Sequence, residues 1–138
     1  MSQFWYTDET SDLLAMEAIT LGITRSLNYY CKRDDLGGTR VSGQHARIAC
    51  VSCPSVFQSL RRLDPPDTEF VILEFDKRFS VYGEKFFEYD FNNPTYLPQE
   101  LFHAFDFVIA DPPYLNKDCM SQTGSVLILP QFGMKCLC

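Results

Sequence analysis

Apolar and polar positions follow a helical rhythm near the start of the chain. Leu14, Ala18 and Leu21 recur at i, i+4 and i+7, which gives one apolar face. Residues 7–9, a threonine followed by two acids, are typical of a helix start. The hydroxyl can cap a free N–H group, and the acids face the positive end of the helix dipole. The pattern therefore predicts a helix that begins near residue 8 and ends at Gly22.

The next stretch, residues 20–46, is expected to be a loop or an insertion. From residue 23 onward it has only weak periodicity and contains a Gly37-Gly38 turn and Gly43. A connection of this length is unusual inside a compact domain, where most loops are short.

Five short apolar runs further along the chain predict strands. They cover residues 47–52, 70–73, 86–89, 105–110 and 125–129. Stretches of helical character separate them: one that opens at Pro54, one over residues 78–82 that stops at Gly83, and one over residues 97–102. Strands that alternate with helices are typical of β-α-β units, so the predicted fold class is α/β with a mostly parallel sheet.

Length and composition indicate one globular domain. The chain has 138 residues, which suits a single domain over residues 1–138. Twelve Phe, seven Tyr and one Trp provide enough apolar surface for a core. No apolar run approaches the roughly 18 residues that a membrane span needs. The first six residues have neither the basic nor the apolar region of a secretory signal, so we expect a cytosolic protein.

The charge balance disfavours nucleic acid as a partner. Twelve Lys and Arg face eighteen Asp and Glu, and residues 64–118 alone carry twelve acids and four bases. Nucleic-acid binding gains most of its affinity when clustered basic residues neutralise phosphates. The acidic segment would attract a basic protein surface instead, although a solubilising surface charge is the simpler interpretation.

The six cysteines leave two interpretations open. Cys50 and Cys53 form a C-x-x-C pair ahead of a predicted helix, which is the spacing of redox motifs. However, Cys50 falls inside an apolar strand, whereas a redox pair lies at a helix entrance. Zinc needs about four ligands, and Cys136-x-Cys138 is not a usual second half of such a site. We therefore favour structural thiols over redox chemistry and expect no metal site.

Acidic residues follow three of the predicted strands. Glu74 and Asp76 follow the second strand, Asp90 the third and Asp111 the fourth. In open α/β sheets, ligands bind beyond the carboxyl ends of the strands. Carboxylates placed there can accept hydrogen bonds from ribose hydroxyls or from an adenine amino group. Acids also favour turns for backbone reasons, so this signal is weak by itself.

Asp111-Pro112-Pro113-Tyr114 is the stronger signal. The two prolines fix the backbone and remove two donors, which leaves carbonyl acceptors beside the carboxylate. Such acceptors can hold the N–H groups of a substrate nitrogen and aim its lone pair, while the Tyr114 ring packs against it. The alternative is a rigid turn after a strand. The arrangement favours methyl transfer to an amino nitrogen, and a lysine amine would also gain cation–π attraction.

An Asp-Pro-Pro-Tyr sequence at the end of the fourth strand resembles the signature of amino-directed, S-adenosylmethionine-dependent methyltransferases. The flanking segments resemble one eukaryotic family, the lysine methyltransferases acting on translation elongation factor 1-alpha, first named as N6-adenine-specific DNA methyltransferase 2. The segments are residues 3–6, 47–52, 54–56, 74–79, 82–84 and 89–94. The resemblance covers residues 3–19 and 47–120.

The resemblance implies a Rossmann-like class I methyltransferase fold, S-adenosylmethionine as cofactor and elongation factor 1-alpha as protein substrate. It also implies a site, and we expect the chain to act as a monomer. Glu74 would bind the cofactor ribose with Asp76 nearby, Asp90 and Phe91 would contact the adenine, and the turn of Ser52, Cys53, Pro54 and Ser55 would line the methionine moiety. Asp111, Pro112, Pro113 and Tyr114 would hold the lysine amine, while Phe4, Trp5 and Tyr6 would help close the pocket.

The chain also departs from the family pattern. It lacks a glycine-rich turn after the first strand, and the resemblance fades after about Cys119, so residues 121–138 look like a divergent tail. We therefore expect the sheet to lack the last strands of the fold. Three alternatives follow: an N6-adenine methyltransferase of nucleic acid, a truncated non-catalytic chain that binds cofactor or partner, and a Cys50/Cys53 redox protein.

Overall fold

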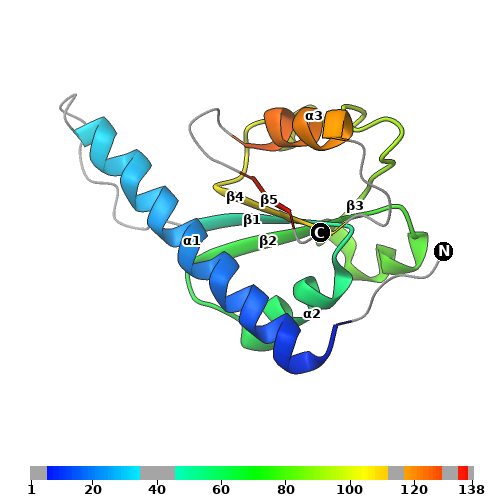
Figure 1. The fold of residues 1–138 in the computed structure, drawn as a ribbon, viewed down its shortest axis with the longest axis horizontal. Helices are drawn as coiled ribbons and strands as arrows, with labels where there is room; N and C mark the ends of the chain where they lie inside the picture. Colours follow the sequence, from blue (N-terminus) through cyan, green and yellow to red (C-terminus); the bar gives the residue numbers. More distant parts are fainter. Residues whose placement is uncertain (1–5, 35–45, 112–116, 129–133, 137–138) are drawn as a thin grey trace.

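Five parallel strands form the centre of the computed structural model, which describes residues 6–34, 46–111, 117–128 and 134–136 (Figure 1). Along the sheet the strand order is β3-β2-β1-β4-β5, and every neighbouring pair is parallel. The strands are β1 (Ala46–Val51), β2 (Thr68–Glu74), β3 (Phe86–Glu88), β4 (Phe107–Ala110) and β5 (Met134–Cys136). The α/β class predicted from the sequence is confirmed, and the arrangement is that of a Rossmann-like methyltransferase fold.

Helices cover both faces of the sheet (Figure 1). One face holds α1 (Asp8–Asp34), α2 (Pro54–Leu63) and the 3₁₀ segment η1 (Lys77–Lys85), and the other holds α3 (Lys117–Leu127). The short 3₁₀ turn η2 (Gln99–Leu101) contributes Leu101 to the second face.

Alternate residues of each strand point to opposite faces, as the pleat requires. On β1, for example, Ile48 and Cys50 pack under α1 and α2, while Ala49 and Val51 pack toward α3. The strands therefore read as continuous apolar runs because both faces are buried.

The first helix is longer than the sequence predicts. Thr7 caps it as expected, since its hydroxyl oxygen accepts a hydrogen bond from Thr10 N at 3.3 Å. Gly22 does not end the helix, and residues 23–34 are helical, so the predicted loop over that segment is wrong. Residues 35–45 lie outside the described residues.

Gly22 instead lies inside α1, where the helix packs against β1. It is buried, and a Cβ built on it would meet Ile48 Cγ1 at 3.4 Å and the Ala46 Cβ at 3.6 Å. A single glycine costs a helix only about 1 kcal/mol, which burial of the apolar face outweighs. As a result, α1 runs back along the sheet from the carboxyl ends of the strands and projects beyond their other ends (Figure 1).

The C-terminal region is a second correction. The expected strand over residues 125–129 is wrong, because residues 125–127 belong to α3. Thr123 and Leu127 on this helix are fully buried against the sheet. A short apolar run fits a strand or a buried helix equally well, so only packing separates the two. The fifth strand lies further on, where Met134 pairs with Val108 and Cys136 with Ala110.

The middle of the chain agrees with the sequence prediction. Helix α2 opens at Pro54, and η1 reaches Gly83, whose φ of 60° interrupts the regular segment. No helix among the described residues is long and apolar enough to span a membrane.

Candidate active site

Three backbone hydrogen bonds extend the ladder beyond the ends of the strands. Tyr89 N donates to Glu74 O at 3.1 Å, Ser52 N to Leu73 O at 2.9 Å, and Asp111 N to Val51 O at 3.1 Å. These bonds connect the first residue after β3 to the end of β2, the first residue after β1 to β2, and the first residue after β4 to the end of β1. They align the predicted site residues along the carboxyl edge of the sheet, where α/β proteins bind ligands.

Glu74 ends β2 and is 5% exposed. Its Oε1 accepts hydrogen bonds from Phe75 N at 3.1 Å and Asp76 N at 3.4 Å. These backbone donors hold the carboxylate at the strand end, and its ribose role stays a prediction.

Asp76 lies two residues after Glu74, and its carboxylate is bound by Arg78. Its Oδ1 caps η1 by accepting from Arg78 N at 3.0 Å, and its Oδ2 accepts from the Arg78 guanidinium at 2.5 Å. The hydrogen bonds to Arg78 lower the pKa of the Asp76 carboxyl. Helix capping therefore accounts for this acid, and its ribose role stays a prediction.

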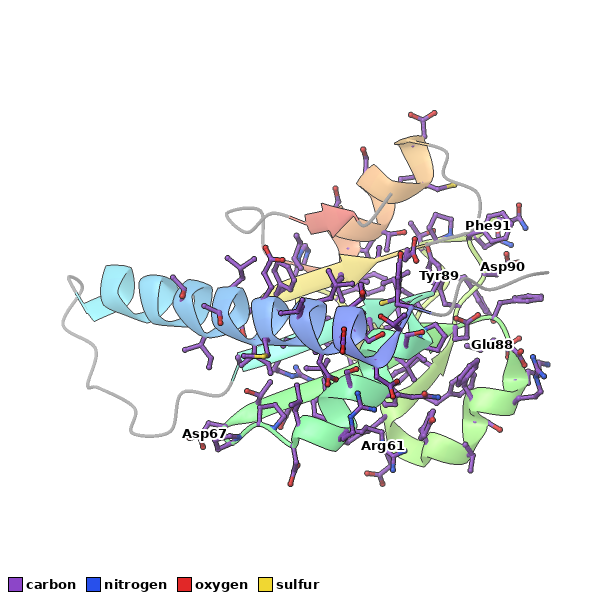
Figure 2. All side chains as sticks on the ribbon, turned by 60° about the horizontal axis from the view of Figure 1, so that its bottom comes forward. Arg61, Asp67, Glu88, Tyr89, Asp90 and Phe91 are labelled. Atoms are coloured by element: carbon purple, nitrogen blue, oxygen red, sulfur yellow. The ribbon has the colours of Figure 1, made fainter. Side chains whose placement is uncertain are left out.

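Asp90 and Phe91 follow β3. Figure 2 shows Glu88, Tyr89, Asp90 and Phe91 in succession at one end of the sheet, while Asp67, which precedes β2, lies at the other end. Asp90 Oδ1 accepts from Asn92 N at 2.9 Å and Asn92 Nδ2 at 3.1 Å, so a local turn fixes the carboxylate. The half-buried Phe91 packs against the α3 side of the core.

Sequence reasoning missed the residues that brace this turn. The Tyr89 hydroxyl is 2.7 Å from Thr123 Oγ1, which in turn donates to Cys119 O at 2.8 Å. Cys119 Sγ donates to Phe91 O at 3.2 Å. These contacts attach α3 to the end of β3. The Asp-x-Asn spacing at residues 90–92 signals the turn, but nothing in the sequence signals the contacts with α3.

The turn between β1 and α2 occupies the place where a glycine-rich loop is usual in such sites. Ser52 has φ 54°, a left-handed conformation that favours glycine. Pro54 opens α2, and Ser55 in its first turn is 6% exposed. Within the described residues, Ser55 Oγ has no hydrogen-bond partner. A buried hydroxyl of this kind at a helix N-terminus is suited to a polar ligand group.

Cys53 belongs to the same turn and is 2% exposed. Its thiol donates to Ile109 O at 3.4 Å, and burial raises the pKa of Cys53 well above the usual value for a thiol. Because thiolates are the reactive form, this cysteine is suited to packing and not to redox exchange. Cys50 is also buried, in the middle of β1. The structure thus favours structural thiols.

Asp111, the first residue of the Asp-Pro-Pro-Tyr sequence, lies directly after β4. Its Oδ2 accepts a 2.6 Å hydrogen bond from the Tyr6 hydroxyl, which belongs to the segment that precedes α1. Burial and the bond to Asp111 raise the pKa of Tyr6 to about 12. At neutral pH this tyrosine is therefore a neutral donor to the carboxylate.

Five of the predicted site residues lie outside the described residues, and their roles stay predictions: Phe4, Trp5, Pro112, Pro113 and Tyr114. In the part of the chain that the structure describes, no group of three or more His, Cys, Asp and Glu side chains could hold a metal ion.

The sequence model of one protein family matches residues 1–132. That family is described as a probable N6-adenine methyltransferase. The chain belongs to this family. The match extends across residues 20–46 and beyond Cys119, so membership covers more of the chain than the motifs that first suggested it.

Individual relatives agree with this membership. EEF1A lysine methyltransferase 1 of Gallus gallus is 45% identical over all of this chain, and the Homo sapiens protein of the same name is 42% identical. A Caenorhabditis elegans protein-lysine N-methyltransferase is 34% identical over 99% of the chain. The chain spans 56% of the length of the first two relatives and 58% of the third.

Proposed function

We propose that the chain is an S-adenosylmethionine-dependent protein-lysine N-methyltransferase that acts on translation elongation factor 1-alpha. The observation that carries the proposal is the alignment of Glu74, Asp90 and Asp111 along one sheet edge by the backbone bonds between strand ends. The names of the relatives, EEF1A lysine methyltransferase 1 and protein-lysine N-methyltransferase, support the choice of acceptor.

The residues at this edge fit the cofactor chemically. Glu74 offers a fixed carboxylate for ribose hydroxyls, and Asp90 offers one for an adenine amino group. The buried Ser55 hydroxyl, which has no partner among the described residues, fits a polar group of the methionine moiety beside the Ser52–Cys53 turn. When bound, the cofactor would supply an electrophilic methyl group on a sulfonium centre.

Asp111 would receive the acceptor nitrogen. A lysine side chain has an unperturbed pKa of about 10.4, so its ammonium must lose a proton before attack. Desolvation on entry to the site favours the neutral amine. Asp111 would then accept an N–H hydrogen bond and orient the lone pair, with Pro112, Pro113 and Tyr114 completing the acceptor site. Orientation of this kind supplies rate without a strong base.

Methylation of adenine in nucleic acid is the second candidate, because the family description names it. The charge distribution favours lysine. Twelve acids and four bases over residues 64–118 attract a basic protein surface and repel phosphates. Because elongation takes place in the cytosol, we also propose that the chain acts there. We further propose that the chain is a single, monomeric domain. Light scattering would test the oligomeric state.

Calorimetric titration with S-adenosylhomocysteine tests the cofactor site. We expect micromolar binding that Asp90→Asn weakens about tenfold, because a charged acceptor is replaced by a neutral one. Asp67→Asn is the matched control, since it removes the same charge at the opposite end of the sheet (Figure 2). No binding by a folded wild-type chain would identify a non-catalytic chain.

A competition assay tests the acceptor. The chain is incubated with labelled S-adenosylmethionine and two kinds of acceptor in equal amounts. The acceptors are recombinant elongation factor 1-alpha and adenine-containing RNA and DNA. We expect label on a lysine of the protein, located by mass spectrometry. Label on adenine, together with salt-dependent nucleic-acid binding, would support the second candidate instead.

A further inference from the structure

We infer that Tyr6 is a positioning residue that acts through Asp111: its hydroxyl occupies one carboxylate oxygen and turns the other toward the acceptor nitrogen. This inference rests on the proposed function and extends it, because it assigns Tyr6 a defined bond in place of a general part in closing the pocket.

The position of Tyr6 is fixed by the start of α1. Thr7, the next residue, caps the helix through Thr10 N at 3.3 Å, and Ser11 N donates to Thr7 O at 2.9 Å. Asp12, one turn further along, accepts from Arg62 of α2 at 2.5 Å. The first two turns of α1 are thereby attached to α2, which itself starts at the candidate cofactor turn.

Asp111 is held from both sides. Its backbone N–H donates to Val51 O at 3.1 Å, and its Oδ2 accepts from the Tyr6 hydroxyl at 2.6 Å. Among the described residues, no hydrogen bond is made to Oδ1. The charge-assisted bond from Tyr6 restricts the orientation of the carboxylate, and we assign Oδ1 to an amine N–H group of the acceptor.

The chemistry of Tyr6 suits orientation and not proton abstraction. With its pKa raised to about 12, the phenol stays protonated at the pH at which a lysine is methylated. It donates one hydrogen bond and carries no charge. A phenylalanine at this position would keep the ring but lose the bond, so Tyr6→Phe isolates the hydroxyl.

The test separates orientation from stability. Tyr6→Phe is compared with wild type and with Tyr96→Phe, whose side chain is 88% exposed and which removes an equivalent hydroxyl. We expect Tyr6→Phe to lower kcat about 10- to 100-fold, the order of loss that misplacement of a reacting group causes. KM for elongation factor 1-alpha and the affinity for S-adenosylhomocysteine should stay within about twofold. Tyr96→Phe should match wild type in kcat, in KM and in the affinity for S-adenosylhomocysteine.

A double-mutant cycle with Asp111→Asn tests whether the two residues act together. Chemical denaturation of wild type, the two single variants and the double variant should give non-additive unfolding constants, with a coupling of about tenfold. An unchanged kcat, a raised kcat, or additive unfolding constants would overturn the inference. If the cycle shows coupling but the wild-type chain transfers no methyl group to lysine, the bond exists but the proposed function fails. The positioning role then fails with it.

Discussion

The Tyr6 hydroxyl donates a 2.6 Å hydrogen bond to Asp111 Oδ2, across 105 positions of the chain. The bond connects the segment before α1 to the end of β4. It brings together a residue that we predicted to close the pocket and the acid that we predicted to hold the substrate. Because Tyr6 titrates far from neutrality, the bond also gives the protein a specific alkaline sensitivity.

The first prediction concerns that sensitivity. The pKa of Tyr6 is raised from 10.0 to about 12, mainly by burial and then by the bond to Asp111. Between these values the unfolded chain has lost the phenol proton and the folded chain has kept it. The stabilisation is therefore complete below about pH 10 and is lost as the pH rises toward 12.

We expect the free energy of unfolding of wild type to fall more steeply over this pH interval than that of Tyr6→Phe. Denaturant titrations at a series of pH values measure both slopes. Tyr89, whose pKa burial also raises, is present in both proteins and cancels in the comparison. Equal slopes would mean that Tyr6 is not protected in solution.

The second prediction separates two acids that are adjacent on the sheet edge. Glu74 is buried at the end of β2, whereas the Asp76 carboxylate pairs with Arg78. Glu74→Gln should weaken S-adenosylhomocysteine binding about 10- to 100-fold, because a charge-assisted hydrogen bond to a ribose hydroxyl is worth about 1.5–3 kcal/mol. Asp76→Asn should change the affinity less than about threefold, because the Asp76 carboxylate is already paired with Arg78.

Calorimetric titration of the two variants with S-adenosylhomocysteine measures both affinities. A larger effect from Asp76 would assign the ribose to that residue and leave Glu74 as a structural acid.

The third prediction uses the glycine inside α1. Gly22→Ala should raise the free energy of unfolding by about 0.5–1 kcal/mol, since alanine is the better helix former. The new methyl group would contact Ile48 Cγ1 at 3.4 Å, an ordinary van der Waals distance. Urea denaturation at 25 °C measures the change. A loss of stability would show that the alanine methyl group does not fit between α1 and β1.

The fourth prediction concerns the C-x-x-C pair. In the native protein, iodoacetamide should modify the half-buried Cys119 well before Cys50 or Cys53, which are buried beneath the helices. The raised pKa of Cys53 lowers its thiolate population further. Peptide mapping by mass spectrometry follows each site. Rapid native modification of Cys53 would restore the redox alternative.

Local sequence patterns were sufficient to predict the elements that are marked by one strong signal. Pro54 and the apolar spacing after it located α2, and the runs at residues 47–52 and 70–73 located β1 and β2. The Asp-Pro-Pro-Tyr sequence pointed to the end of β4 as the place for an acceptor group. These signals are short-range, because capping, proline geometry and burial period act within a few residues.

Other features depended on contacts between distant residues. Gly22 was expected to end the helix, yet it lies buried against Ile48 inside α1, which runs to Asp34. The run at residues 125–129 reads as a strand, yet Thr123 and Leu127 fix a helix there by packing on the sheet.

The sequence by itself thus determined the α/β class, the strand-end acids and the family of this protein. Only the tertiary structure decided that Tyr6 meets Asp111 and that α3 braces the turn after β3. The physical reason is that local propensity is a weak preference of about 1 kcal/mol per residue, which burial and long-range hydrogen bonds override.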